Sequence, residues 1–288
     1  MNRTMQKVVP ANQSRSHRRH LLAPGRILVY VYLILLYFPI YWMITMAFKR
    51  RVDIVTTTPK LVFEPVLTNF TYLFARGAIQ ESILRSLWVA LLAVGFSLVL
   101  GVACAYALAR FRWFRQQDIE FFIVSTRMLP PVAVILPFYA IFIRFQLLDN
   151  IVALAAVYLL IDLPLVIWLL LGFFRTIPGE LDDAARIDGC NSLTAFWYID
   201  LPLVKSGIAT AAMLAFLFTW GELFFAFILT SLNSTFPVAL LSFLAVGLEV
   251  QYGPMAAAGV IATIPSIIIA LLARNALIEG FRSLAGVH

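Results

Sequence analysis

The chain has 288 residues, of which 62% are apolar and 13% are charged, and its formal net charge is +7. Soluble globular domains contain about 45–50% apolar and about 25% charged residues. The composition therefore excludes a disordered chain, a disulfide-rich secreted scaffold and an ordinary cytosolic enzyme, and it predicts a membrane protein. Excess Lys and Arg on cytoplasmic loops accounts for the charge, so we expect contact with membrane lipid and no nucleic-acid partner.

The N-terminal segment 1–26 is basic, and we expect it to be a cytoplasmic tail. The apolar run at 27–47 that follows it is longer than the roughly 7–15 residues of a signal-peptide core. The basic run Lys49-Arg50-Arg51 comes next, where a signal peptide would have a small-residue cleavage site. We therefore expect an uncleaved first transmembrane helix.

Six segments have the roughly 20 residues that cross a hydrocarbon core of about 30 Å. The sequence thus predicts an all-α membrane protein with six transmembrane helices. With both termini in the cytoplasm, the cytoplasmic segments hold 14 Lys and Arg residues and the outer loops hold 7, which is the orientation that the positive-inside rule favours. The predicted spans are 27–47, 86–109, 121–143, 151–174, 207–230 and 255–273.

One segment conflicts with that rule. The predicted extracytoplasmic loop 48–85 carries six of the seven outer positive charges, and the role of its Lys49-Arg50-Arg51 run is unexplained. The rest of the chain divides into a transmembrane domain at 86–274 and a cytoplasmic tail at 275–288.

Prolines recur inside the predicted spans. Broken helices are tolerated where a cavity or a neighbouring helix satisfies the backbone, so these prolines indicate either a transport path or ordinary membrane-helix kinks. They are Pro130, Pro131, Pro137, Pro164 and Pro265.

Two kinds of site are absent from the sequence. The three histidines, His17, His20 and His288, all lie in the tails, so no span supplies a histidine zinc ligand set, and we expect no metal site. The chain has no G-x4-G-K-[ST] phosphate loop, so we expect it to bind no ATP of its own. The segment 185–189 superficially resembles the D-G…A-R loops of nucleotide-handling membrane enzymes, but its order is reversed.

The predicted cytoplasmic loop 175–206 has a character of its own. Pro178 suits a first helical position, and acidic residues occupy the turns after it, where the helix dipole favours anions. Gly189 suits a left-handed helix stop, and Asn191 or Ser192 suits the N-cap of a second short helix that ends before Pro202. The acidic residues are Glu180, Asp182 and Asp183.

Ala185 and Gly189 lie four residues apart, so we expect them to share one bare helix face that another protein can approach closely. The alternative is an amphipathic helix lying on the membrane. That reading would require basic flanks and bulky apolar anchors, which this loop lacks. We therefore favour a helix that docks a partner.

The pattern Asp183-Ala184-Ala185-x3-Gly189, with Ile199-x-Leu201-Pro202, resembles the EAA loop of ABC-importer permeases, the binding-protein-dependent inner-membrane components. The match is closest to the smaller permease of maltose-type importers. Asp183 stands where that family usually has Glu, Gly221 where it commonly has Asn, and Arg85 where it commonly has Asn. Other segments also follow the family order: 106–110 (Tyr-Ala-Leu-Ala-Arg), 127–131, 136–137, 172–174 and 255–258.

The resemblance implies a type I ABC importer permease fold and a non-enzymatic, multi-pass subunit of the bacterial cytoplasmic (inner) membrane. The implied assembly has a second permease, two ATPase subunits that bind ATP and Mg, and an extracytoplasmic solute-binding protein. The implied cargo is a sugar or related polyol, with glycerol phosphate also open. The residues that the resemblance assigns to ATPase coupling are Glu180, Asp183, Ala184, Ala185, Asp188 and Gly189.

Three charged residues fall inside the predicted spans: Arg127, Asp162 and Glu222. Asp162 and Glu222 could supply acceptors for a sugar beside the aromatic platform of Trp220, or they could instead hold helices together. A different class of function, an ion-coupled secondary transporter using Asp162 or Glu222, is a further alternative. For Arg127, near the inner boundary, we expect a structural role with the side chain snorkelling.

Overall fold

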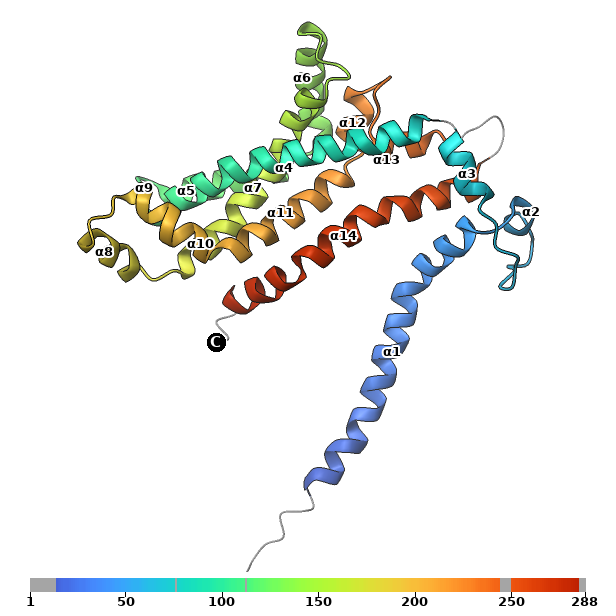
Figure 1. The fold of residues 1–288 in the computed structure, drawn as a ribbon, viewed down its shortest axis with the longest axis horizontal. Coiled ribbons are helices and arrows are strands. Elements are labelled where there is room, and N and C mark those ends of the chain that lie inside the picture. The colour runs from blue at the N-terminus through green and yellow to red at the C-terminus, as the bar shows by residue number, and fades with distance from the viewer. Residues whose placement is uncertain (1–13, 76, 112, 244–249, 285–288) are drawn as a thin grey trace, which may run out of the picture.

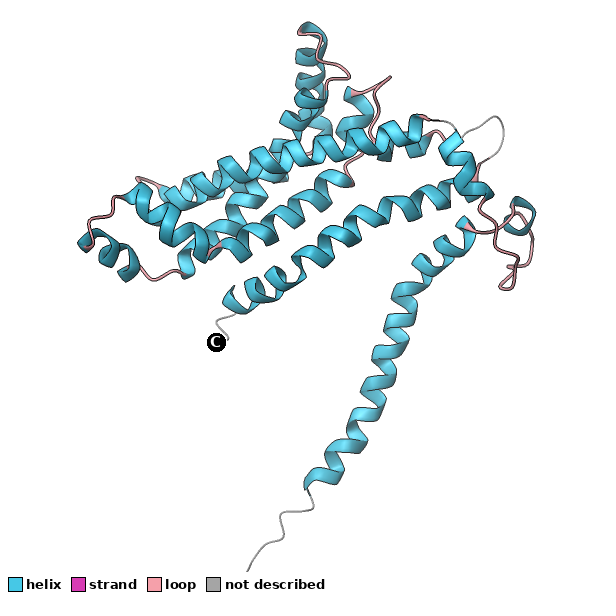
Figure 2. Cartoon of the chain, in the orientation of Figure 1, coloured by secondary structure: helices cyan, strands magenta, loops and turns pink. Residues whose placement is uncertain are grey.

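Four uninterrupted helices are long and apolar enough to cross a membrane. The computed structural model describes residues 14–75, 77–111, 113–243 and 250–284, and within these residues it contains helices and no strand (Figure 2). The four helices are α1 (Ser14–Ala47), α4 (Ala78–Arg110), α7 (Ile151–Thr176) and α14 (Tyr252–Leu284).

Two further spans are bent pairs of helices. α5 (Gln116–Ser125), continued by the short helix η1 (Thr126–Met128), meets α6 (Pro131–Arg144) at 86°. A segment made of α9 (Ser192–Ala195), η2 (Phe196–Asp200) and α10 (Leu201–Leu203) meets α11 (Lys205–Trp220) at 71°. The described residues therefore form up to six spans, if each bent pair counts as one.

The prediction of a single third helix at 121–143 was wrong. Leu129 and Pro130 both have extended backbone, with ψ of 127° and 128°, and helix α6 starts at Pro131. Proline lacks a backbone N–H and disfavours helical geometry in the residue before it, so the Pro130-Pro131 pair ends one helix and starts another.

The prediction of an unbroken fifth span at 207–230 was also wrong. α11 ends at Trp220, and a new short helix, α12 (Phe224–Leu229), starts after a three-residue break. The carboxylate of Glu222 caps α12 by accepting hydrogen bonds from the backbone N–H groups of Phe225 (3.0 Å) and Ala226 (3.3 Å). A residue read from the sequence as an intramembrane charge is thus an N-terminal cap. α13 (Phe236–Leu241) follows.

Small residues allow α4 to pack closely along α7. A Cβ atom placed on Gly101 of α4 would lie 2.6 Å from Cγ1 of Val166 on α7. α11 joins the same bundle, where a Cβ atom on Gly207 would lie 2.5 Å from the ring of Phe173. α4, α7, α11 and α14 together enclose the larger apolar core, and Figure 1 shows them running side by side. We call the two ends of this bundle the α3 end and the α8 end, after α3 (Thr68–Ala75) and α8 (Glu180–Ile187).

α1 diverges from the bundle. It joins the other helices near its last residues, where Ala47 is buried and the side chain of Met43 meets Gly259 of α14. Its other end points into open space (Figure 1). In the most apolar 18-residue window within Arg26–Ala47 the chain itself buries 0% of the residues, so other molecules, lipid or protein, must cover this helix.

The charged segment after α1 is folded, and several of its basic side chains have partners inside the chain. Lys49 is 3% exposed, and its Nζ lies 4.7 Å from the ring centroid of Trp42 and 5.0 Å from that of Phe63, which are cation–π distances. Arg50 pairs with Glu64. Lys60 pairs with Asp53 of α2 (Arg51–Ile54) at 2.6 Å. The expected loop 48–85 thus also contains α2, α3 and the first turns of α4, and part of its positive charge has internal partners.

Candidate functional site

The loop singled out in the sequence contains the two short helices that were expected. α8 has three acidic residues in its first turn, and Gly189 follows it with a left-handed backbone, φ +84°. The Oδ1 atom of Asn191 accepts the backbone N–H of Thr194 at 2.8 Å and caps the second helix. Two details differ from the expectation. α8 begins at Glu180 rather than at Pro178, and the second helical segment continues past Pro202 to Leu203, with Pro202 in the first turn of the short helix α10, a position that tolerates proline.

The two faces of α8 have different environments. Glu180, Asp183, Ala184 and Asp188 are exposed, and so is Gly189 just beyond the helix. The expectation that Ala185 and Gly189 share one bare exposed face was wrong, because Ala185 is 3% exposed and packs inside the chain. Of the predicted coupling residues, the acidic ones are therefore accessible to a partner protein, whereas Ala185 is not.

The expectation that this loop lacks bulky apolar anchors was wrong, because apolar side chains are exposed on α8 and on the two helices that follow it. Ile187 on α8 is 86% exposed, and Leu193 on α9 and Tyr198 on η2 are also largely exposed. Exposed apolar side chains clustered next to charged ones mark a surface that another protein covers. α8, with these neighbours, therefore has the features of a docking element.

A cluster that the sequence reading did not assign lies beneath α8. Arg110, the last residue of α4, is 3.0 Å from Oδ2 of Asp182 through Nε and 2.6 Å from Oδ1 of Asp200 through Nη2. Its Nη1 also donates to the carbonyl oxygen of Ile177 at 3.2 Å. One turn earlier on α4, the hydroxyl of Tyr106 donates to the carbonyl oxygen of Ser192 at 3.1 Å.

The charges in this cluster are partly withdrawn from solvent. Asp200 is fully buried, and the side chains of Arg110 and Asp182 are 11% and 18% exposed. Burial, and next the charge of Asp200, raise the pKa of Asp182, while Arg110 acts in the opposite direction. An Arg that ends a transmembrane helix, followed by acidic residues in a later loop, was the signal available in the sequence.

Asp162 is engaged by the chain itself. It is fully buried in α7, and its Oδ2 accepts the hydroxyl of Thr219 on α11 at 2.5 Å. Its Oδ1 has no hydrogen-bond partner among the described residues. The buried hydroxyl of Tyr158, one turn earlier on the same helix, faces the carboxylate of Glu222. The hydrogen bond between Thr219 and Asp162 therefore joins α11 to α7 inside the bundle.

Trp220 is also held inside the bundle. Its Nε1 donates to the carbonyl oxygen of Ala262 on α14 at 2.9 Å, and its ring stacks on Phe216 with an interplanar angle of 10°. The three residues predicted for a substrate path, Asp162, Trp220 and Glu222, are thus all hydrogen-bonded within the chain, to α11, α14 and α12 respectively. Arg127, at the break between α5 and α6, lies with its guanidinium carbon 5.0 Å from the ring centroid of Phe218.

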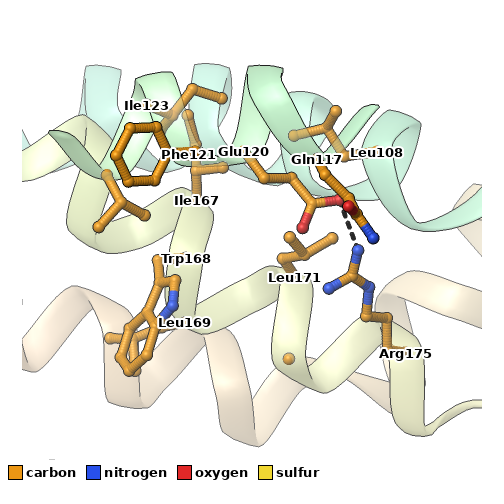
Figure 3. Close-up of a pocket in the computed structure, with 12 residues that line it drawn as sticks. Leu108, Gln117, Glu120, Phe121, Ile123, Ile167, Trp168, Leu169, Leu171 and Arg175 are labelled. Atoms are coloured by element: carbon orange, nitrogen blue, oxygen red, sulfur yellow. Dashed lines mark hydrogen bonds and ion pairs between the residues drawn. The ribbon is translucent and has the colours of Figure 1, made fainter. Parts of the chain in front are cut away.

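A cavity of about 500 Å³ lies elsewhere, between α5 and the second half of α7 (Figure 3). Its walls are mostly apolar and include Phe121 and Trp168, and Glu120 and Arg175 form an ion pair of 2.5 Å at one side. None of the residues predicted from the sequence for coupling or for a substrate path lines it.

The sequence and the fold of this chain are similar to those of known proteins. Residues 97–283 match the family described as the binding-protein-dependent transport system inner membrane component. A probable ABC transporter permease protein of Sinorhizobium fredii is 32% identical over 274 residues, which cover 94% of this chain and 97% of that protein. The trehalose transport system permease protein SugB of Mycobacterium tuberculosis is 30% identical, over 85% of this chain and 90% of its own.

Among solved structures, this chain is similar to one in the crystal structure of a bacterial ABC transporter involved in the import of the acidic polysaccharide alginate. The TM-score is 0.73 at 20% sequence identity, and the match covers 93% of this chain and 99% of the other. This similarity shows a shared fold.

Proposed function

Because this chain belongs to the family of binding-protein-dependent transport system inner membrane components and is a permease subunit of the cytoplasmic membrane, we propose that it imports a carbohydrate by transmitting the action of an ATPase through α8. The observation that carries the proposal is the geometry of α8, a short acidic helix at one end of the bundle that ends at an exposed glycine.

The proposed orientation places the α8 end in the cytoplasm and the α3 end outside. The distribution of Lys and Arg along the sequence supports this orientation, and the main exception, the segment after α1, has internal partners for Lys49, Arg50 and Lys60. ATP is hydrolysed in the cytoplasm, so an ATPase can reach only the end of the bundle that faces it.

Docking of the ATPase is proposed to use Glu180, Asp183, Asp188 and Gly189, with Ala184 in the same contact. Asp183 has a weak partner in this chain, Arg186 at 3.7 Å, and both side chains are well exposed. Exposed pairs of this kind contribute little, about 0–1 kcal/mol, so a basic group of a partner can replace Arg186. Ala185 is proposed to hold α8 against the chain itself.

A second permease is the proposed cover of α1, whose apolar residues the chain leaves unburied. The complete assembly would add two ATPase subunits, which bind ATP and Mg, and an extracytoplasmic solute-binding protein that delivers the cargo. The relative named for trehalose transport supports a saccharide as that cargo.

For Asp162, Trp220 and Glu222 we propose the structural alternative. Asp162 connects α7 to α11, Trp220 connects α11 to α14, and Glu222 connects the break after α11 to the start of α12. By holding these helices in place they shape the path that a substrate takes. An ion relay through Asp162 or Glu222 has less support, because Thr219 and backbone N–H groups already bind these carboxylates.

The test is purification and reconstitution. The chain is purified from its own membrane with its associated ATPase, and the solute-binding protein is screened by calorimetry against trehalose, maltose and glycerol 3-phosphate. Uptake into proteoliposomes is then measured with and without internal ATP. The proposal expects ATP-dependent uptake of a saccharide. Uptake that persists without ATP and stops when an ion gradient is dissipated would overturn it in favour of a secondary transporter.

A further inference from the structure

One guanidinium group connects the transmembrane bundle to three points of the loop that carries α8. Arg110 ends α4 and contacts the carbonyl oxygen of Ile177, the carboxylate of Asp182 and the carboxylate of Asp200. These contacts lie just before α8, in its first turn and at the end of η2. The loop is therefore attached to α4 at both of its ends.

The contacts match the chemistry of arginine. The guanidinium group is planar, is always charged and carries donors in a fixed fork, so it can serve several acceptors at once. Its Nη1 and Nη2 atoms donate hydrogen bonds to Ile177 and Asp200, whereas its Nε forms an ion pair with Asp182 and no hydrogen bond to any described residue. Charge-assisted hydrogen bonds are short and strong, as the 2.6 Å distance from Nη2 to Asp200 shows. Because Asp200 is fully buried and Arg110 is 11% exposed, solvent screens this pair little.

α8 has few other routes into the bundle. Of its residues only Ala185 is buried, and its main packing neighbour is α9 rather than a long helix. α9 in turn meets α4 where the Tyr106 hydroxyl bonds to Ser192 and the Tyr106 ring lies 4.7 Å, centroid to centroid, from the ring of Phe196. The contacts that Arg110 and Tyr106 make with the loop thus all start from the last turns of α4.

We propose that Arg110 is the positioning residue that makes α8 and the adjacent end of α4 move as one body, so that a force applied to α8 enters the bundle through α4. The proposal rests on the proposed function, in which an ATPase moves α8. From α4 the displacement passes to α7, because the two helices are packed closely along their length, with Gly101 against Val166.

The alternative is an ion cluster that only helps the loop to fold. A folding role would change how much complex assembles, whereas a positioning role would change how α8 and α4 move within complexes that have assembled. A distance measured inside the assembled complex separates the two.

The experiment places one spin label on each side of Arg110. Leu181 lies on α8 at the edge of its exposed face, and Phe114 is exposed just after α4. The Trp113 indole, which donates to the carbonyl oxygen of Ala107 at 3.2 Å, fixes the Phe114 segment to α4. The labelled chain carries Leu181→Cys and Phe114→Cys in a background with Cys104→Ser and Cys190→Ser. The full complex with its ATPase is studied in nanodiscs, nucleotide-free and trapped with ATP, Mg and vanadate.

Electron–electron resonance then gives the label distance in both states. We expect one narrow distance, unchanged by trapping, in the parent chain and in the matched control Arg115→Gln, whose guanidinium group is exposed and pairs only locally with Asp118. In Arg110→Gln complexes that still hydrolyse ATP, trapping should produce a second, longer distance. Arg110→Lys keeps the positive charge but loses the planar set of guanidinium donors, so it should also show the second distance. This variant replaces Arg110→Gln in the measurement if the Gln variant does not assemble.

Two results overturn the inference: a distance that stays single in both Arg110 variants, or one that already changes on trapping in the parent. Failure of the parent chain to purify with any ATPase overturns the proposed function itself and is seen before any label is introduced.

Discussion

The hydroxyl of Thr219 on α11 donates a 2.5 Å hydrogen bond to the carboxylate of Asp162 on α7. Both residues are buried, and the second carboxylate oxygen has no partner among the described residues. Thr219 is therefore the hydrogen-bond donor on which this buried carboxylate depends.

Thr219→Val should destabilise the chain. The substitution keeps the side-chain shape and removes the donor, which leaves a buried carboxylate unsatisfied at a cost of about 1–3 kcal/mol. The measurement is the melting temperature in detergent, with Thr219→Ser as the control that retains the donor. The double variant Asp162→Leu, Thr219→Val should be less destabilised than Thr219→Val alone. Equal melting of Thr219→Val and the parent would show that the bond contributes nothing.

Gly101→Ala should also destabilise the chain, because the new Cβ would lie 2.6 Å from Cγ1 of Val166. Overpacking of this kind costs about 1–3 kcal/mol. Gly95 is a matched control on the same helix, since a Cβ there has no atom within 4 Å, and Gly95→Ala should stabilise by about 0.5–1 kcal/mol. Adding Val166→Ala to Gly101→Ala should restore the melting temperature. If the double variant melts no higher than Gly101→Ala alone, the destabilisation does not come from the contact with Val166.

Gly189→Val should abolish ATP-driven uptake while leaving the bundle folded. A Cβ at Gly189 meets no atom within 4 Å inside the chain, so the internal cost is backbone strain at φ +84°, about 1–2 kcal/mol. Gly77 offers a control at the α3 end: its φ is +64° and its Cβ position is equally open, and because its ψ of −44° lies outside the left-handed helical region, Val is at least as strained there. Gly77→Val should keep uptake. Normal uptake by Gly189→Val would remove this residue from the coupling surface.

Asp149 should make stability depend on pH in the acid range. It lies between α6 and α7, and it accepts the backbone N–H of Ser231 (2.7 Å) and of Asn233 (2.9 Å). Burial, the largest single influence, raises the pKa of Asp149. The hydrogen bonds together lower it by more than burial raises it, so the pKa of Asp149 lies below its usual value. The stabilisation is complete above the unfolded-state pKa of about 3.9 and is lost as the pH falls through the lower folded-state value.

Asp149→Asn tests this directly, because Asn also tolerates the left-handed backbone of this position, φ 61°. The parent should melt at a higher temperature than Asp149→Asn at pH 7, and the difference should shrink toward pH 3. A difference that does not change with pH would mean that the charge of Asp149 contributes nothing.

Local rules predicted the α8 region well. Glycine favours a left-handed stop, Asn favours an N-cap, and acidic residues favour a helix start. The structure has Gly189, Asn191 and Glu180 in these roles. The burial of Ala185 could not be predicted in this way, because it depends on what packs beneath the helix rather than on the helix itself.

The cluster around Arg110 could not be predicted from local patterns either. Its partners Ile177 and Asp200 are 67 and 90 residues away in the sequence, so only the packing of α4 against the loop brings them together. Hydropathy likewise identified the third and fifth spans but not their interruptions. Pro130-Pro131 was seen in the sequence, yet the run around it is apolar enough to resemble one continuous helix.

The separation of α1 from the bundle has a consequence for genetics. Its apolar window is not buried by the rest of the chain, so substitutions there leave the interior packing of α4, α7, α11 and α14 untouched. If a second permease covers α1, as proposed, the effects of these substitutions should instead appear in subunit abundance, because an α1 that no longer fits that subunit would leave an unassembled chain for membrane proteases to remove. Suppressors of such changes should therefore arise in the gene for the neighbouring subunit.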